Sequence, residues 1–315
     1  MLTAHERIQR YIHRTPVFTS AFVNSLAGAE LFFKCENLQK AGAFKARGAS
    51  NAVLELSEAQ AARGVATHSS GNHGTCLSYA AERRGIQCTV VMPRTASEAK
   101  KEAVRGYGGR IVECEPSMSS REAVLAGIVA DTGAEFVHPY DDRRVIAGQG
   151  TCARELIGQV DGMDAVIAPI GGGGMVSGTC LAVSDLASRV HVYAAEPEQA
   201  DDAYRSFRAG RLIADDAPDT VADGLRVPLK DLTWHFVRNH VSDILTASEI
   251  EIVDAMKLIW KHLKLVVEAS SAVPLATILK NRDLFAGKRV GVILTGGNVD
   301  LDALPWRQRS PARGN

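Results

Sequence analysis

Short apolar runs alternate with longer amphipathic stretches through most of this 315-residue chain, and this alternation limits the folds that it can adopt. Short apolar, β-branched runs bounded by turn residues are typical of buried strands, and longer stretches with apolar residues three or four apart are typical of helices. Strands that alternate with helices favour parallel sheets joined by crossover helices. The sequence therefore predicts an α/β protein.

The same pattern predicts the bounds of the regular elements. The predicted strands are 65–68, 88–92, 110–113, 135–138, 165–170, 191–195 and 290–295. The predicted helices are 74–84, 97–107, 119–130, 142–159, 175–188, 250–263 and 271–280, the last with Pro274 in its first turn, where proline is tolerated. Region 203–247 has the least regular pattern, and the Arg-rich end from Pro305 onward predicts a loose tail.

The overall composition excludes several classes of protein. The chain has 36 Lys and Arg against 36 Asp and Glu, so it lacks the basic excess of a nucleic-acid-binding protein. No segment approaches the ~20 apolar residues of a membrane span, and the N-terminus lacks the apolar core of a secretory signal. The six cysteines lack metal-ligand spacing and are predicted to be buried reduced thiols, which favours a cytoplasmic protein.

The length predicts two domains, because 315 residues exceed what one hydrophobic core usually supports. An unbroken run of predicted strands and helices occupies roughly 60 to 142. We therefore expect a small α/β domain at 56–142, inserted in a larger domain that comprises 1–55 and 143–315.

A run of four glycines follows the predicted strand 165–170 and precedes a predicted helix: Gly171, Gly172, Gly173 and Gly174. Without side chains, backbone N–H groups can approach an anion closely, and the helix N-terminus adds its dipole. The run predicts a phosphate site more strongly than a flexible turn, because each glycine costs backbone entropy on folding. A dinucleotide-binding unit is the rival interpretation, with Glu196 as its acidic residue, but the third glycine of that motif is missing.

A second candidate loop follows the predicted strand 65–68 and contains Ser69, Ser70, Gly71, Asn72 and His73. Two hydroxyls, an amide and free N–H groups suit a carboxylate. An ordinary helix cap explains the Ser and Asn residues equally well, and a lone His beside a helix start is more often structural. The residues alone leave both interpretations open.

Two further positions carry reactive groups. Lys45 lies between Phe44 and an Ala-Arg-Gly sequence that predicts a turn, where a desolvated amine could attack an aldehyde. The residues alone favour a solvated surface lysine. Thr295 ends the predicted strand 290–295, where its hydroxyl could bond a buried ligand nitrogen, although a capped turn is the simpler interpretation.

Taken together, these motifs resemble one family. Six segments occur in the order and spacing of the fold-type II pyridoxal-phosphate enzymes: FFKCENLQKAGAFKARGA, THSSGNHG, APIGGGGMVSG, AAEPEQADDAY, ADG and LTGGNVDL. They are most similar to the serine racemase and serine/threonine dehydratase branch, over the span from about Arg14 to Asp302. The resemblance implies a two-lobed fold like that of the tryptophan synthase β-subunit. Parallel-rich twisted sheets would be covered by helices on both faces, and the larger domain would bind the cofactor.

The resemblance also implies two sets of site residues. The residues expected to bind pyridoxal 5′-phosphate are Phe44, Lys45, Asn72, Gly171, Gly172, Gly173, Gly174, Met175, Glu268 and Thr295. The residues expected to bind the substrate are Ser69, Ser70, Gly71, Asn72, His73 and Arg121.

Lys45 and Ser70 are the implied catalytic residues. Lys45 would hold the cofactor covalently and remove the substrate Cα proton, after which the β-hydroxyl leaves and a 2-oxo acid and ammonia form. Ser70 resembles the second base of the racemase; racemisation needs two bases and elimination only one, so Ser70 permits racemisation without requiring it. Thr295 stands where the family usually has Ser or Cys, and a hydroxyl facing the ring nitrogen leaves it unprotonated, which favours elimination.

The implied activity is dehydration of a β-hydroxy-α-amino acid of the serine or threonine type. Arg121 is compatible with a substrate that has a second carboxylate, such as 3-hydroxyaspartate. A solvated position on a helix face explains this arginine equally well. Val227 replaces a serine of the racemase and suits threonine or phenylserine instead. A serine racemase with dehydratase side activity is an alternative. A nucleotide-cofactor oxidoreductase and a non-enzymatic effector-binding protein are alternatives from other classes.

The resemblance extends to a metal site and to assembly. Glu196, Ala200 and Asp202 resemble the family's divalent-cation site, and their hard oxygen ligands fit Mg²⁺ or Ca²⁺. Without the resemblance, a solvated acidic loop would be favoured. A homodimer that acts on a small amino acid is implied as well. The segment that begins at Glu268, Glu-Ala-Ser-Ser-Ala-Val, departs from the commoner Glu-Pro-Ser/Thr-Ala/Gly form.

Overall fold

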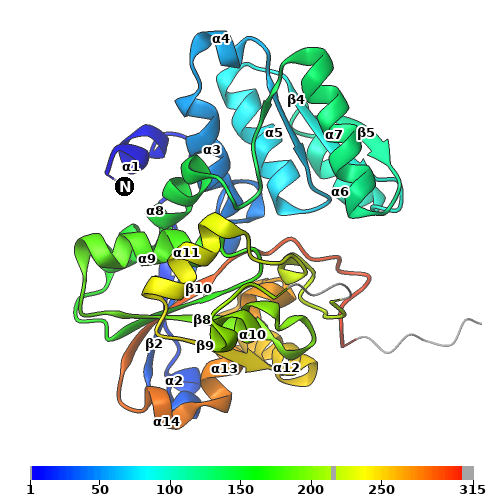
Figure 1. Ribbon diagram of the computed structural model, residues 1–315. Helices are drawn as coiled ribbons and strands as arrows, with labels where there is room; N and C mark the ends of the chain where they lie inside the picture. The colour runs from blue at the N-terminus through cyan, green and yellow to red at the C-terminus, as the bar shows by residue number, and fades with distance from the viewer. Residues whose placement is uncertain (1, 214–217, 307–315) are drawn as a thin grey trace, which may run out of the picture.

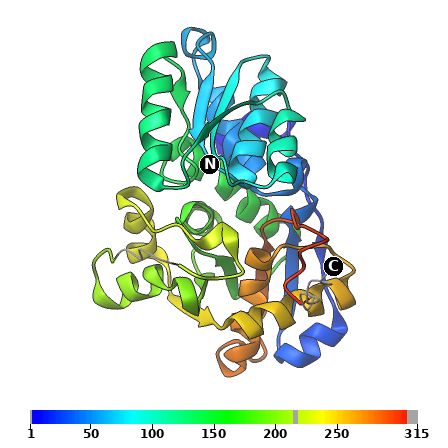
Figure 2. The ribbon, with the colours of Figure 1, turned by 90° about the vertical axis from the view of Figure 1, so that its right-hand side faces the viewer.

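The computed structural model describes residues 2–213 and 218–306, which are arranged around two sheets (Figures 1 and 2). The larger sheet has the strand order β1-β2-β10-β7-β8-β9, and the smaller has the order β5-β4-β3-β6. All neighbouring strands are parallel except β1, which pairs antiparallel with β2. Both sheets are therefore parallel-rich, as the alternation of strands and helices predicts.

The elements have the following bounds. The strands are β1 (Val17–Phe18), β2 (Glu30–Cys35), β3 (Val65–His68), β4 (Cys88–Pro93), β5 (Arg110–Cys114), β6 (Glu135–Phe136), β7 (Ala165–Pro169), β8 (His191–Pro197), β9 (Asp243–Ala247) and β10 (Arg289–Leu294). The α-helices are α1 (Leu2–Ile8), α2 (Ala21–Ala27), α3 (Lys45–Glu55), α4 (Glu58–Ala61), α5 (Asn72–Arg84), α6 (Glu98–Arg105), α7 (Met118–Thr132), α8 (Arg143–Gln159), α9 (Gly174–Leu186), α10 (Asp202–Ala209), α11 (Asp231–His240), α12 (Glu249–Leu258), α13 (Ala269–Lys280) and α14 (Arg282–Phe285).

Both faces of the large sheet are covered by helices. Side chains alternate between the faces of a strand, so β7 contributes Ala165 and Ile167 to one core and Val166 and Ala168 to the other. The first core is completed by α2, α12 and α13, and the second by α8, α9 and α11. The expected fold class, two-lobed and parallel-rich with helices on both faces, is confirmed.

The small sheet is covered in the same way. Leu77 of α5 and Val104 of α6 pack on one face, and Leu125 of α7 packs on the other. Helix α3 packs against both α5 and α8, and α8 packs against α9, so α3 and α8 connect the two sheets. The domain boundaries after residues 55 and 142 stay a prediction.

Most predicted elements agree with the structure to within two residues at each end, as for the strand predicted at 88–92 and found at Cys88–Pro93. In region 203–247, which has the least regular pattern, the described residues between α10 and α11 form loops and the short 3-10 turn Asp223–Leu225, but the region also contains α11 and β9. The predicted helix 250–263 ends in a π-helical turn at Ile259–Leu263. Pro274 lies in the second turn of α13 and not in the first, because the helix begins at Ala269.

Two further expectations concern the cysteines and the tail. All six cysteines are buried and free, as predicted. Of the predicted tail, the structure describes only Pro305 and Trp306, so Arg307, Arg309 and Arg313 lie outside the described residues. Within the described ranges, no helix is both long and apolar enough to span a membrane.

Candidate active site

Lys45 is the first residue of α3, and this residue is only partly exposed to solvent. Its Nζ donates a hydrogen bond to the Pro139 carbonyl at 2.7 Å and lies 5.0 Å from the centre of the Phe44 ring. Desolvation lowers the pKa of Lys45 to about 8, although Cys76 and Glu268 favour the charged form. The predicted turn after Lys45 is wrong, since these residues are helical, and the amine is not a solvated surface group.

Asn72, the first residue of α5, connects the small sheet to the large one. Its amide Nδ2 donates to both carboxylate oxygens of Glu268, at 3.0 and 3.1 Å, and its Oδ1 accepts from Asn298 Nδ2 at 2.8 Å. Burial raises the pKa of Glu268 to about 7, and the Asn72 amide opposes this rise. The Asn72 side chain is therefore held in one orientation close to the Lys45 amine, which Glu268 also influences.

The four glycines form a buried turn between β7 and α9, as predicted. Gly173 has a φ of +82°, which favours glycine, and a Cβ on Gly172 would lie 2.5 Å from the Tyr140 ring. Among the described residues, none accepts a hydrogen bond from the backbone N–H of Gly171, Gly172 or Gly173. Buried N–H groups are nearly always paired, so these donors at a helix N-terminus fit an anion such as the cofactor phosphate.

Three residues after β6 belong to the same site, and the sequence interpretation missed them. The Pro139 carbonyl binds Lys45, and the Tyr140 ring packs on the glycine turn. His138 Nδ1 accepts the backbone N–H groups of Tyr140 and Asp141, at 3.2 and 2.9 Å, so the neutral ring carries its proton on Nε2. Burial, with cationic neighbours, lowers the pKa of His138 to about 3. Their position at the end of the predicted strand 135–138 and directly after it was the signal that could have found them.

The loop between β3 and α5 holds the predicted substrate residues. The Ser69 hydroxyl accepts the Gly71 N–H at 3.3 Å, and the Ser70 hydroxyl bonds no other described residue. His73 is buried, and its Nε2 contacts the Val137 carbonyl at 3.1 Å. Desolvation lowers the pKa of His73 to about 3, so it is a neutral buried residue, consistent with a structural role.

Arg121 lies in the first turn of α7. Its charge helps to lower the pKa of His68, the last residue of β3, after the larger effect of burial. His68 directly precedes Ser69, so the guanidinium lies near the predicted substrate loop. The Arg121 Nε is buried and has no hydrogen-bond partner among the described residues. A buried donor of this kind fits an anionic group of a ligand better than a solvated helix face.

Thr295 follows β10 and is buried, 3% exposed. Its carbonyl accepts the Phe44 N–H at 2.9 Å, which places it beside the start of α3. Its hydroxyl lies 3.1 Å from the Ser271 hydroxyl. Glu268 directly precedes α13, and Ser271 lies in the first turn of that helix. The predicted cofactor residues from α3, α5, α13 and β10 thus meet in one place.

The predicted metal residues lie at the end of β8. The Glu196 carboxylate accepts the N–H groups of Ala203 and Tyr204, at 3.0 and 2.7 Å. Burial and the nearby Asp202 carboxylate raise the pKa of Glu196 well above its usual range. Ala200, which lies between Glu196 and Asp202 in the sequence, is also buried. No cluster of three or more His, Cys, Asp or Glu suited to a metal ion occurs in the described part of the chain.

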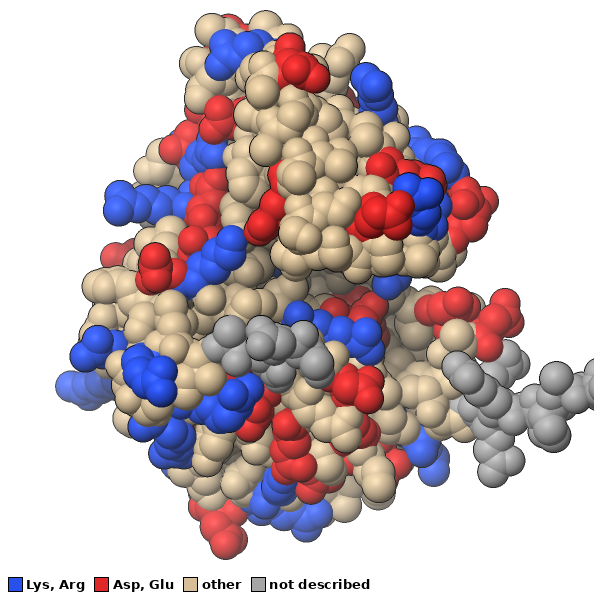
Figure 3. Space-filling model, turned by 45° about the vertical axis from the view of Figure 1, so that its right-hand side comes forward, with Lys and Arg blue, Asp and Glu red and all other residues tan. Residues whose placement is uncertain are grey.

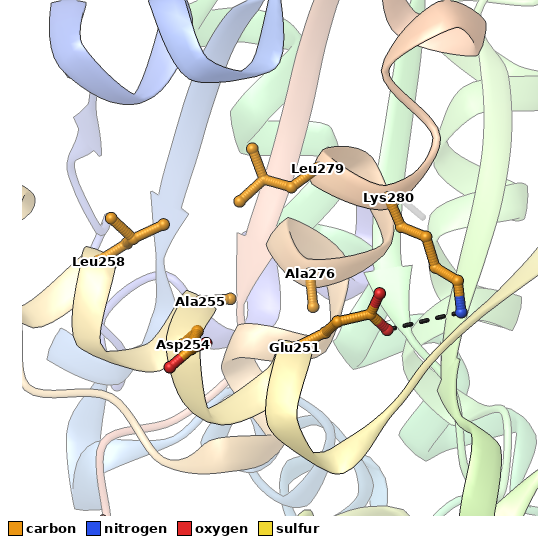
Figure 4. A pocket seen from close by; sticks show the side chains of 7 residues that line it. All are labelled: Glu251, Asp254, Ala255, Leu258, Ala276, Leu279 and Lys280. Atoms are coloured by element: carbon orange, nitrogen blue, oxygen red, sulfur yellow. Dashed lines mark ion pairs between the residues drawn. The ribbon is translucent and has the colours of Figure 1, made fainter.

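The surface is hollowed in several places. Figure 3 shows an indentation between the upper and lower parts of the molecule, with acidic and basic side chains mixed around it. Figure 4 shows a smaller hollow between α12 and α13, where Lys280 pairs with Glu251 at 3.5 Å. The smaller hollow contains none of the predicted site residues.

Comparisons with known proteins agree with this site. Residues 8–296 match a family described as "Pyridoxal-phosphate dependent enzyme". The chain is 74% identical over 306 residues to a β-hydroxyaspartate dehydratase of Paracoccus denitrificans, covering 97% of each chain. It is similar to the crystal structure of serine racemase from Dictyostelium discoideum, with 46% identity, a TM-score of 0.92 and coverage of 95% and 97%. A pyridoxal 5′-phosphate-dependent aspartate racemase has 38% identity and a TM-score of 0.92, with 97% of each chain covered.

Proposed function

This chain belongs to the pyridoxal-phosphate-dependent enzymes, and on this premise we propose that it is a dehydratase of 3-hydroxyaspartate. The observation that carries the choice of substrate is the Arg121 Nε, buried beside the substrate loop without a partner. The 74% identity to a β-hydroxyaspartate dehydratase supports the same choice. The sequence predicts dehydration of a serine- or threonine-type amino acid, with 3-hydroxyaspartate as one alternative substrate, and we choose this alternative. The nucleotide-cofactor oxidoreductase is not part of the proposal.

The residues around Lys45 fit pyridoxal phosphate. The unpaired N–H groups of Gly171, Gly172 and Gly173 provide an anion site, to which Gly174 and Met175 at the start of α9 add their own N–H groups. Phe44, Asn72, Glu268 and Thr295 would surround the ring. When bound, this cofactor supplies an electron sink for negative charge at the substrate Cα.

Lys45 would act on the substrate as a base at Cα. Its lowered pKa, about 8, leaves a useful fraction of neutral amine near neutral pH. As the Cα–H bond breaks, the Cβ–O bond breaks too, and the hydroxyl leaves as water after taking up a proton. The unsaturated amine that is released tautomerises and consumes one water on hydrolysis. The net products of 3-hydroxyaspartate are therefore oxaloacetate and ammonia.

Two carboxylate sites would orient this substrate. The Ser69–Gly71 region, with its hydroxyls and N–H groups, would bind the α-carboxylate. Arg121 would bind the β-carboxylate through a charge-assisted hydrogen bond. A serine or threonine molecule lacks the second carboxylate and would leave the guanidinium unpaired. Ser70, whose hydroxyl bonds no other described residue, favours racemisation as a second activity at the same site.

The test is a substrate panel of 3-hydroxyaspartate, serine, threonine and phenylserine, with 2-oxo acid, ammonia and D-amino acid all measured. We expect kcat/KM for 3-hydroxyaspartate to exceed that for serine by roughly 10- to 100-fold, the worth of one hydrogen bond to a charged group. A preference for serine or phenylserine would refute the proposed substrate. Purified protein that takes up no pyridoxal phosphate would refute the site itself.

A divalent cation, a homodimer and a cytoplasmic location remain part of the proposal. The buried Glu196 carboxylate, whose pKa is raised by burial and by the nearby Asp202 carboxylate, favours a cation at this position. We expect removal of the cation by a chelator to lower the melting temperature of the protein. If the melting temperature does not change although the treated protein is shown to be metal-free, this result would argue against the site. Phe18 and Phe22 are 39% and 50% exposed, which suits an interface between two copies, and light scattering tests the dimer.

A further inference from the structure

Tyr140 is a buried tyrosine at the proposed site, and the proposed function gives its hydroxyl no role. The residue is 6% exposed, and its ring packs on the glycine turn, where a Cβ on Gly172 would lie 2.5 Å from the ring. The His138 ring meets it edge to face, with the ring centres 4.6 Å apart. These contacts hold the ring in place and so restrict where its hydroxyl can point.

The hydroxyl on this ring is a donor without a partner. Tyr140 donates its backbone N–H to His138 Nδ1, but its hydroxyl has no hydrogen-bond partner in the part of the chain that the structure describes. Burial raises the pKa of Tyr140, with a smaller effect from nearby carboxylates that include Glu122, so the hydroxyl keeps its proton at neutral pH. Since the hydroxyl of a buried tyrosine usually has a partner, this donor is available to a ligand.

Two neighbours place the Tyr140 side chain beside both the proposed base and the start of α7. The carbonyl of Pro139, the preceding residue, accepts a hydrogen bond from the Lys45 amine at 2.7 Å. Glu122, whose carboxylate helps to raise the pKa of Tyr140, directly follows Arg121 in the sequence of α7. The hydroxyl therefore belongs to the part of the site where the substrate would bind.

The acceptors that this site would hold differ in how many donors they already have. The cofactor phosphate would have the N–H groups of Gly171, Gly172 and Gly173, which bond no acceptor among the described residues. The α-carboxylate of the substrate would have the hydroxyls and N–H groups of the Ser69–Gly71 region. The β-carboxylate would have Arg121 alone, although its two oxygens can accept several hydrogen bonds. It is therefore the acceptor with the most room for another donor.

We propose that the Tyr140 hydroxyl determines substrate specificity together with Arg121, by donating a hydrogen bond to the β-carboxylate of the substrate. This inference rests on the proposed function. The guanidinium supplies the positive charge, and the hydroxyl, on a ring held by its packing, supplies a second direction from which the carboxylate is bound. Serine and threonine have no β-carboxylate, so the hydroxyl adds nothing to their binding.

Tyr140→Phe tests this assignment, because phenylalanine keeps the ring contacts with Gly172 and His138 and removes only the oxygen. The ratio of kcat/KM for 3-hydroxyaspartate to that for serine should fall by roughly tenfold, as expected for the loss of one hydrogen bond to a charged group. The affinity of the holoenzyme for succinate, an unreactive dicarboxylate, should fall by a similar factor in calorimetric titrations. The affinity of the apoprotein for pyridoxal phosphate should change by less than about twofold.

Tyr79→Phe is the matched control. Tyr79 is also buried, at 7%, but its hydroxyl donates to the Tyr11 carbonyl within the protein. Removing this hydroxyl should lower the melting temperature and leave the substrate ratio unchanged, because the lost hydrogen bond is part of the fold. A fall of the ratio by the same factor in Tyr79→Phe would show that the effect of Tyr140→Phe is not specific, and would overturn the assignment.

The remaining outcomes separate this inference from the proposed function. If the wild-type enzyme prefers 3-hydroxyaspartate and Tyr140→Phe keeps the ratio, the inference is overturned and the proposed substrate stands. Equal losses with both substrates would assign the Tyr140 hydroxyl to the β-hydroxyl that they share, and a loss of cofactor affinity would assign it to the phosphate; either result overturns the inference. If the wild-type enzyme does not prefer 3-hydroxyaspartate to serine, the proposed substrate and this inference fail together.

Discussion

Arg47 and Lys45 lie two residues apart on α3, yet their surroundings differ completely. Arg47 is 0% exposed and forms paired hydrogen bonds with the carboxylates of Glu36 and Glu155, at 2.7 to 2.8 Å. Among the described residues, the Lys45 amine has one hydrogen-bond partner, the Pro139 carbonyl. One side of the helix start is therefore a completed ionic network, and the other presents a lightly held amine to the site.

The network behind α3 extends to β2 and α8. Lys34 Nζ donates to the Thr15 carbonyl, Glu155 and Gln159, at 2.7 to 2.9 Å. Two cations and two carboxylates thus balance each other out of contact with water, which is tolerable only because each is fully bonded. On the site side, the Arg121 Nε and three glycine N–H groups have no partner among the described residues. At these positions the ionic network is fully bonded, whereas the buried donors at the site remain available to a ligand.

Lys45→Ala is the change that should separate the two sides most strongly. We expect activity to fall by at least about 10²- to 10⁴-fold and the visible band of bound pyridoxal phosphate to be lost, because the base and its covalent link are removed. The free energy of unfolding of the apoprotein should not fall, since the lost amine was poorly solvated. Lys261→Ala, at an exposed lysine, is the control for both measurements. A large loss of apoprotein stability would place Lys45 with the scaffold instead.

Arg47→Met tests the other side of the comparison. The substitution leaves Glu36 and Glu155 buried with too little positive charge, which typically costs about 3–5 kcal/mol of unfolding free energy. Urea unfolding of the apoprotein measures this loss, and Arg10→Met at an exposed position serves as the control. A loss below about 1 kcal/mol would show that the network does not stabilise the fold as its geometry indicates.

The pH dependence of cofactor uptake is a smaller effect that sharpens the comparison. Desolvation lowers the pKa of Lys45 from 10.5 to about 8, so the neutral, nucleophilic amine forms as the pH rises through about 8. The rate of covalent uptake by the apoprotein should therefore rise about tenfold per pH unit below this value and level off above it. Stopped-flow absorbance measures the rate. A rise that continues toward pH 10 would mean that the amine is solvated.

Much of this molecule can be predicted from the sequence, and the parts that cannot share a physical reason. The four strands of the small sheet, the strands β7, β8 and β10 of the large sheet, the glycine turn and the loop before α5 are local patterns of a few residues, and the structure has them where they were expected. Strand β2 was not recognised because Lys34 is buried only through Glu155, a residue 121 positions away. Lys45 was expected to be solvated because its neighbours in the sequence do not show its contact with Pro139, a residue far away along the chain.

The site residues after β6 were missed differently. The Pro139 carbonyl is a main-chain atom, so no residue type announces its contact with Lys45. Tyr140 matters because its ring fills the space that a side chain on Gly172 would need, and only the packed structure brings the two together. Arg121 could be named from the sequence, but its lack of a partner could not be foreseen.

Arg121→Gln offers the most direct test of the central claim, that the buried Arg121 Nε, which has no partner among the described residues, marks the substrate site. The measurement is the ratio of kcat/KM for 3-hydroxyaspartate to that for serine, with Arg110→Gln, at an exposed arginine on β5, as the control. The ratio should fall by roughly 10- to 100-fold in Arg121→Gln, mainly through activity toward 3-hydroxyaspartate, and stay unchanged in Arg110→Gln. An unchanged ratio in Arg121→Gln would contradict the account.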